Sequence, residues 1–101
     1  MRSKQAKAHD ITKAVRDAVK FRDDNRCIFC HSHSHLQIAH YIGRGCGGLG
    51  IEQNLAVVCA ECHRELDQGM NRRKYREYFR QYLERQYPWF PNEERKYNKW
   101  K

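Results

Sequence analysis

Residues 54–63, with the sequence NLAVVCAECH, combine an apolar run with a cysteine pair, and this combination indicates the fold. Leu55 to Val58 form a short apolar run that predicts a strand. The pair Cys59 and Cys62 follows directly with Cys-x-x-Cys spacing, and the pattern over residues 60–67 is helical. This stretch therefore predicts a strand that enters a cysteine knuckle and continues as a helix.

A second Cys-x-x-Cys pair, Cys27 and Cys30, lies upstream. Four thiolates are a ligand set that structural zinc binds tetrahedrally. A redox role is the alternative for such pairs, but two of them in one small basic chain favour zinc. The fifth cysteine, Cys46, makes the total odd, and the polar first ten residues do not look like a secretory signal, so we expect no disulfide framework. We predict one structural zinc ion bound by Cys27, Cys30, Cys59 and Cys62, with Cys46 as a spare thiol.

Residues 31–58 separate the two pairs, a longer interval than the about 15–20 residues of a usual zinc ribbon. The apolar stretch 36–42 predicts a first strand, and the glycine-rich segment 43–50 predicts a loop before the strand at 55–58. The interval therefore contains an inserted hairpin.

Helices are expected on both sides of this unit. Apolar residues at helical spacing predict one over 11–22, with Asp10 or Thr12 as its cap, and an aromatic stripe predicts another over 71–86, ended by Pro88.

Length and charge limit the function classes. The 101 residues favour a single domain, 1–101, with a basic arm over 1–10, a core over 11–69, and a C-terminal helix and aromatic tail over 70–101. No apolar run reaches the about 18 residues of a membrane span, and we expect a cytoplasmic protein. The net charge of +8 favours a polyanion, with DNA or RNA first and an anionic membrane second, over an ordinary solvated basic surface.

Four polar residues are candidates for chemistry, and each has an ordinary alternative. His63 and Asp67 stand four residues apart on the predicted helix and share a face, so they are either a chelating pair or a surface pair. His40 lies on the first predicted strand, where a histidine is often a core residue. Asn54 follows the glycine loop, where asparagine often forms a turn.

Taken together, these residues occur in a familiar order. The strings IAHYI (38–42), a Gly-Gly loop, NLAVVC (54–59) and Cys62-His63 resemble the HNH endonuclease family, and more narrowly its small zinc-bound bacteriophage members. The resemblance covers about residues 11–69. It implies an α+β fold: a ββα-metal (HNH) core with a four-cysteine zinc site, flanked by an N-terminal and a C-terminal helix.

The resemblance also implies roles for single residues. His40 matches the general base, and Asn54 matches the residue that ties the loop down and orients that base. His63 matches a ligand of a catalytic divalent ion (Mg²⁺, Mn²⁺, Ni²⁺ or Zn²⁺), and Asp67 falls where the colicin nucleases place a second helical ligand. Arg44, just after the first strand, is the candidate phosphate clamp.

The implied function is a metal-dependent endonuclease or nickase that hydrolyses DNA phosphodiester bonds. One departure from the pattern matters, because Ala39 stands where many members carry an acidic residue or a second histidine as a metal ligand. The alternative is therefore a catalytically weak or inactive zinc-stabilised module that binds nucleic acid. Bacteriophage DNA-packaging proteins are the protein partners that the resemblance suggests.

Other positions receive weaker interpretations. A solvated turn is favoured for His31, His33 and His35, with a metal ligand or a DNA contact as the alternatives. The aromatic residues near the C-terminus could instead serve a protein partner. The expected phosphate contacts on the last helix are Arg72, Arg73, Lys74, Arg76 and Arg80.

Overall fold

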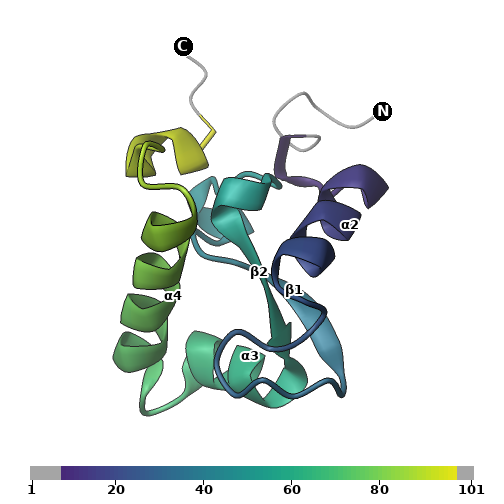
Figure 1. Ribbon diagram of the computed structural model, residues 1–101. Coiled ribbons are helices and arrows are strands. Elements are labelled where there is room, and N and C mark those ends of the chain that lie inside the picture. The colour runs from purple at the N-terminus through teal and green to yellow at the C-terminus, as the bar shows by residue number, and fades with distance from the viewer. Residues whose placement is uncertain (1–7, 98–101) are drawn as a thin grey trace.

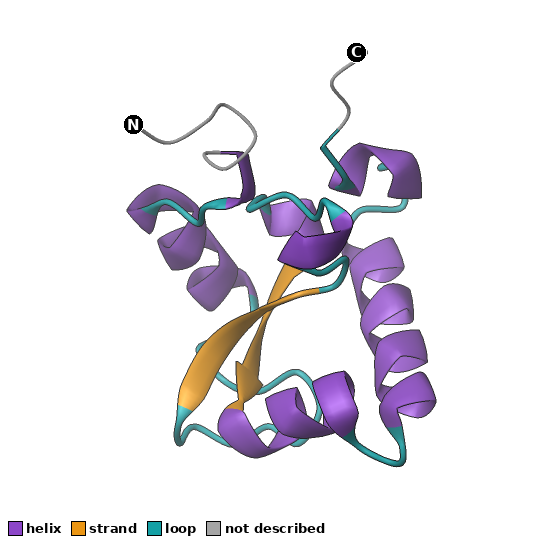
Figure 2. Cartoon of the chain, turned by 180° about the vertical axis from the view of Figure 1, so that it is seen from behind, coloured by secondary structure: helices purple, strands orange, loops and turns teal. Residues whose placement is uncertain are grey.

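A two-stranded antiparallel sheet lies at the centre of the molecule, with helices on both of its faces (Figure 1). The computed structural model describes residues 8–97. In the pairing register, Leu36 is opposite Cys59 and His40 is opposite Leu55. Seen from behind, the two strands form one twisted ribbon between the helices (Figure 2). The elements are α2 (Lys13–Arg22), β1 (Leu36–His40), β2 (Leu55–Cys59), α3 (Ala60–Gln68) and α4 (Arg72–Gln86), with short 3-10 turns at Arg44–Cys46, Glu52–Asn54 and Asn92–Arg95.

Strand β2 is buried along its whole length because both of its faces are covered. Successive side chains of a strand point to opposite faces. Leu55 and Val57 pack with Val19 of α2, whereas Ala56 and Val58 pack into the larger core formed with α3 and α4. A strand buried on both faces explains why this segment is continuously apolar and shows no alternation.

The helix ends follow local side-chain chemistry. The hydroxyl of Thr12 accepts a hydrogen bond from the Val15 amide at 3.2 Å, so Thr12 is the cap and α2 begins one residue later. Past the helix, Asp24 and Asn25 have φ values of 57° and 49°. Short polar residues of this kind tolerate the left-handed conformation, which turns the chain toward the first cysteine pair. Of the two caps expected, Thr12 is therefore confirmed.

The other predicted boundaries agree within about two residues. Strand β1 is shorter than the expected 36–42, because the backbone of Ile42 bonds to the Asn54 side chain instead of to a strand. Helix α4 buries Phe79 and Leu83 of its apolar stripe, while Tyr78 is 40% exposed.

Only the end of the basic arm expected over residues 1–10 lies within the described residues. The side chain of His9 is buried, and its Nδ1 lies 2.5 Å from the Gly48 carbonyl oxygen. Gly50 donates a backbone hydrogen bond to Ala8. Residues 8–10 are therefore packed against the glycine-rich loop, and the remainder of the arm lies outside the described residues. Trp100 of the aromatic tail lies outside them as well.

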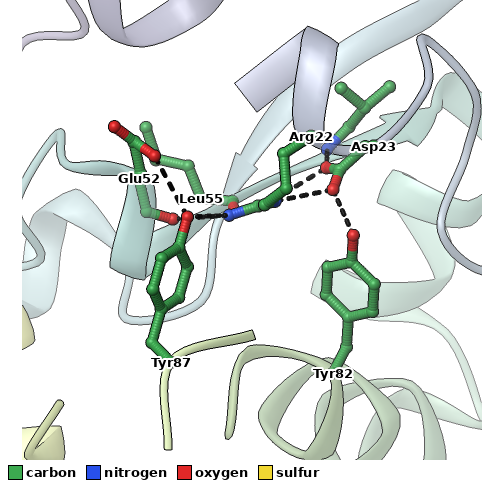
Figure 3. A network of polar contacts seen from close by, with 7 residues as sticks. Arg22, Asp23, Glu52, Leu55, Tyr82 and Tyr87 are labelled. Atoms are coloured by element: carbon green, nitrogen blue, oxygen red, sulfur yellow. Dashed lines mark hydrogen bonds and ion pairs between the residues drawn. The ribbon is translucent and has the colours of Figure 1, made fainter. Parts of the chain in front are cut away.

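A buried ion pair joins α2 to the edge of β2 (Figure 3). The Arg22 guanidinium donates to both carboxylate oxygens of Asp23, at 2.7 and 2.9 Å, and to the Leu55 carbonyl at 2.6 Å. The Asp23 carboxylate also accepts from the Val57 amide at 2.8 Å and from the hydroxyl of Tyr82 on α4. Because each group is bonded, the pair avoids the cost of burying a free charge.

Candidate metal centres and catalytic residues

The four cysteines of the two Cys-x-x-Cys pairs come together at one end of the sheet. The Sγ atoms of Cys27, Cys30, Cys59 and Cys62 all lie within 4.8 Å of one another, and those of Cys30 and Cys59 are 3.6 Å apart. Tetrahedral zinc with Zn–S bonds of about 2.3 Å places its sulfurs about 3.8 Å apart. The donor set and its spacing therefore fit the predicted structural zinc ion.

Backbone amides around the cluster point toward its sulfur atoms. The Phe29 amide donates to Cys27 Sγ at 3.4 Å, and the Cys62 amide donates to Cys59 Sγ at 3.3 Å. The second of these bonds also caps the N-terminus of α3. Burial raises the pKa of the Cys62 thiol, so its thiolate form requires a positive partner such as a metal ion.

The cluster completes the predicted architecture. It connects the segment before β1 to the junction of β2 and α3, and α2 and α4 flank that unit. The expected α+β fold, a ββα-metal core with a four-cysteine metal site between an N-terminal and a C-terminal helix, is thus confirmed.

The remaining cysteine and the histidine-rich turn contribute no side chain to this cluster. Cys46 is exposed. The backbone φ values of His31 and His35 are positive, at 65° and 53°, as in a turn, and His33 Nδ1 lies 3.3 Å from the Asn25 carbonyl oxygen. Within residues 8–97, the four cysteines form the only group of three or more His, Cys, Asp or Glu side chains at metal-binding distance.

Asn54 closes the loop that joins the two strands. Its Oδ1 accepts from the Ile42 amide at 2.9 Å, and its Nδ2 donates to the carbonyls of Ile42 and Leu49 at 3.1 and 2.9 Å. The side chain is fully buried, and its own carbonyl accepts from Tyr41 at 2.8 Å. The backbone immediately after His40 is therefore held by the asparagine that the sequence singled out.

His40 ends β1 and is partly buried. It pairs with Leu55 across the sheet, so its side chain starts on the face that α2 covers. Its Nε2 lies 3.4 Å from the His9 carbonyl oxygen. A carbonyl only accepts, so Nε2 carries the proton and Nδ1 of the neutral ring has the free lone pair. Burial lowers the pKa of His40, and the nearby charge of Arg44 lowers it further, although the bond to the His9 carbonyl opposes both.

His63 and Asp67 meet on α3 as their spacing predicts. His63 Nε2 lies 3.5 Å from Asp67 Oδ2. The other ring nitrogen, Nδ1, lies 2.5 Å from Oε1 of Gln37 on β1, a contact that the sequence did not reveal. Ligands about 2.1 Å from a metal ion are about 3.0–3.4 Å apart, so a divalent cation fits between the His63 and Asp67 donors.

His40 and the residue before it lie on opposite faces of β1. Ala39 is fully buried in the core that faces α3, and His40, one residue further along, lies on the opposite face of the strand. The charge of His63 nevertheless contributes to lowering the pKa of His40. His40 is thus within electrostatic range of His63, and neither histidine belongs to a group of three or more metal-ligand side chains within residues 8–97.

Chain segments from both ends of the molecule hold the loop beside His40. Arg44 donates to the Asp10 carboxylate at 3.0 Å. Leu49 donates to the backbone of Arg95, whose buried side chain donates to the Gln53 carbonyl at 2.5 Å. The expected phosphate clamp is therefore paired with an acidic residue that a phosphate would have to displace.

Four of the five expected phosphate contacts on α4 fall into two groups. Arg72, Arg73 and Arg76 line a shallow hollow beside Tyr41, and the Arg76 guanidinium lies 4.9 Å from the centre of the Tyr41 ring. Arg80 instead forms ion pairs with Glu77 and Glu84 of its own helix. The first group leaves a basic surface next to the end of β1, whereas the charge of Arg80 is already compensated.

The fold and the cysteine cluster define a class, that of small α+β domains with a ββα-metal core and a four-cysteine cluster that can bind a metal ion. No protein-family model matches this chain, and no curated protein does. Among solved structures, the Type IV phosphorothioation-dependent restriction endonuclease ScoMcrA is similar, with a TM-score of 0.65 and 22% sequence identity. The match covers 77% of this chain but only 17% of ScoMcrA, so at this identity the comparison establishes a shared fold. None of the described helices has the length and apolar character needed to cross a membrane.

Proposed function

We propose that this protein is a metal-dependent endonuclease of the HNH type that hydrolyses DNA phosphodiester bonds by nicking or by cutting both strands. The observation that carries the proposal is the Asn54 side chain, bonded to both backbone groups of Ile42 directly beyond His40. The resemblance assigns this role, which is to hold the loop and orient the general base, to the asparagine of the motif. The ββα-metal core around it is the fold that the resemblance implies.

His40 is the proposed general base. A base must be neutral at the working pH and must have a free lone pair directed at a water molecule. The lowered pKa of His40 favours the neutral ring at pH 7, and the bond from Nε2 to the His9 carbonyl leaves Nδ1 to take the proton. The His9 backbone is thus a partner that would fix the tautomer of the base.

His63 and Asp67 are the proposed ligands of the catalytic cation, with water and phosphate oxygens in its other positions. When bound, a divalent cation at this place would hold a phosphate oxygen and stabilise charge on the leaving 3′ oxygen. Arg44 would hold a neighbouring phosphate after exchanging its Asp10 partner, since guanidinium groups bind both carboxylates and phosphates.

DNA is the proposed substrate on three grounds. The chain carries a net charge of +8, and Arg72, Arg73 and Arg76 form an exposed basic surface beside the end of β1. The similar solved structure is itself a restriction endonuclease. A bacteriophage origin, action in the cytoplasm of the bacterial host and contact with DNA-packaging proteins are proposed from the sequence resemblance alone.

The test is cleavage of supercoiled plasmid by the zinc-loaded protein with added Mg²⁺, Mn²⁺ or Ni²⁺. We expect nicked or linear product from the wild type and none from His40→Ala or His63→Ala. A His40→Ala protein that cuts as fast as the wild type would show that the assigned base is wrong.

A second candidate is a non-catalytic zinc module that binds nucleic acid. The observation in its favour is the end of β1, where Ala39 supplies no metal ligand and His40 points away from α3. This candidate predicts DNA binding that weakens steeply with salt and no cleavage with any cation. Metal-dependent nicking that His63→Ala abolishes would eliminate it.

A further inference from the structure

Gln37 on β1 contacts the proposed metal ligand His63 through a hydrogen bond that spans two elements. Its side chain is exposed and starts on the face of β1 that α3 covers, the face it shares with Ala39. The Gln37 Oε1 atom lies 2.5 Å from His63 Nδ1. An amide oxygen only accepts, so Nδ1 is the protonated nitrogen of His63.

The proton on Nδ1 determines the state of the other ring nitrogen of His63, Nε2. With the proton on Nδ1, a neutral His63 presents the lone pair of Nε2, and this atom faces Asp67 Oδ2 at 3.5 Å. Two acceptors that face each other repel unless a positive charge lies between them. The hydrogen bond from β1 therefore prepares His63 and Asp67 to share a cation.

We propose that Gln37 is a positioning residue that fixes the tautomer and ring orientation of His63, so that Nε2 and Asp67 bind the divalent cation of the proposed nuclease site. Histidines that ligate metals in proteins almost always donate their second ring N–H to such a partner, and losing it typically costs about 10–100-fold in metal affinity. Gln37 touches neither the cation nor the substrate, and it acts through His63. The inference rests on the proposed function only for the identity of the metal site.

If His63 and Asp67 are only a surface pair, the expected results differ. If His63 and Asp67 were an ordinary ion pair, the imidazole would carry both protons and would donate to Gln37 and Asp67 together. The contact from Gln37 would then be incidental, and its loss would leave cation affinity unchanged. The state of the His63 ring and the affinity for a cation therefore distinguish the two.

The experiment uses the full chain with its zinc site loaded and Mn²⁺ as the probe, because Mn²⁺ prefers oxygen ligands such as carboxylates to thiolates. Mn²⁺ affinity is measured by calorimetric titration for the wild type, Gln37→Leu, Gln37→Glu and the control Gln86→Leu, which removes an exposed glutamine at the end of α4. We expect Gln37→Leu to weaken Mn²⁺ binding by about 10–100-fold. Gln37→Glu, which still accepts from Nδ1, should bind at least as tightly as the wild type, and Gln86→Leu should match it.

The second measurement is ring-nitrogen NMR of the wild type without Mn²⁺, at about pH 8, where an imidazole is normally neutral. We expect the Nδ1–H tautomer of His63. An Nε2–H tautomer, a doubly protonated ring, no Mn²⁺ binding by the wild type, or equal affinity of Gln37→Leu and wild type would each overturn the proposal. If Gln37→Leu does not fold, as judged by its zinc content, the wild-type ring state decides.

Plasmid cleavage by the same samples separates this inference from the proposed function. A wild type that binds Mn²⁺ in a Gln37-dependent way but never cuts DNA keeps the positioning role and ends the nuclease proposal. A wild type that cuts DNA, together with a Gln37→Leu variant that binds Mn²⁺ normally, keeps the nuclease proposal and ends the positioning role of Gln37.

Discussion

The two ends of the central hairpin are held by different chemistry. At one end, four thiolates from two separate knuckles gather where β1 starts and β2 stops. At the other end, Asn54 bonds to the backbone of the loop, and the segments around His9 and Arg95 pack on both sides of it. The first end has the ligand set of a structural metal ion, whereas the second depends on buried hydrogen bonds and close backbone contacts.

The proposed site requires both His63 and His40 to be held in place, and each end of the hairpin holds one of them. The thiolate end fixes where α3 begins and therefore where His63 lies. The loop end fixes the backbone around His40. Damage at the thiolate end should remove the fold as a whole, and damage at the loop end should loosen one residue of the site in a folded domain.

The largest effect is expected from Cys59→Ser. Binding of structural zinc contributes about 10–16 kcal/mol in zinc-finger peptides, and a domain of this size has little other core with which to replace it. We expect loss of bound zinc, loss of cooperative thermal unfolding and loss of any cleavage. Cys46→Ser is the control, because Cys46 is exposed and lies outside the cluster. A folded and active Cys59→Ser protein would show that the metal does not hold this end together.

Asn54→Ala should have the next largest effect. It removes three side-chain hydrogen bonds and leaves the Ile42 amide and two carbonyls without these partners. We expect about 3–5 kcal/mol of destabilisation in urea unfolding with zinc still bound. Asn71→Ala is matched to it, since Asn71 is exposed and makes no capping bond to α4. Equal stability of the two variants would contradict the proposed role of Asn54 at the loop end.

Gly50→Ala tests the packing of the N-terminal segment on the loop. A Cβ atom at Gly50 would lie 2.2 Å from the Asp10 carbonyl oxygen, so one of the two backbones must move. We expect about 1–3 kcal/mol of destabilisation by the same measurement. Gly45→Ala should be nearly neutral, because nothing lies within 4 Å of its Cβ position. If the two variants lose equal stability, the close contact with Asp10 does not exist in solution.

The smallest effect concerns pH and leaves the fold intact. The pKa of His40 lies below its usual value of 6.5, so its neutral form predominates above that pH, and the base is lost as pH falls through the lowered pKa. We expect plasmid nicking rates that are level above about pH 6.5 and that fall with a midpoint below it. Arg44→Gln removes a charge that lowers this pKa, so its midpoint should move to higher pH. A wild-type midpoint above 6.5 would contradict the burial of His40.

The sequence predicted the thiolate end more fully than the loop end, for a physical reason. Zinc knuckles and amphipathic helices are local patterns, so cysteine spacing and apolar periodicity predict them directly. The contacts of His9 with Gly48 and of Gln37 with His63 join residues far apart in the chain, and no local pattern marks either partner.

Asp23 also makes contacts with residues far away in the chain that no local sequence pattern marks. The helix predicted over residues 11–22 stops just before Asp23, and α2 does end there. The structure adds that its carboxylate covers the free edge of β2 at Val57 and pairs with Arg22. The signal that was available was a pair of adjacent charges at the end of an amphipathic helix, and only the fold shows that they are buried together.

The most direct test of the account is a comparison of plasmid nicking by the wild type, His40→Ala and His63→Ala, each with one zinc ion per chain and with Mn²⁺ added. We expect metal-dependent nicking by the wild type and none by either variant, although all three proteins remain folded. A wild type that binds DNA but never nicks it would contradict the proposed nuclease, and variants that nick it equally well would contradict the roles assigned to His40 and His63.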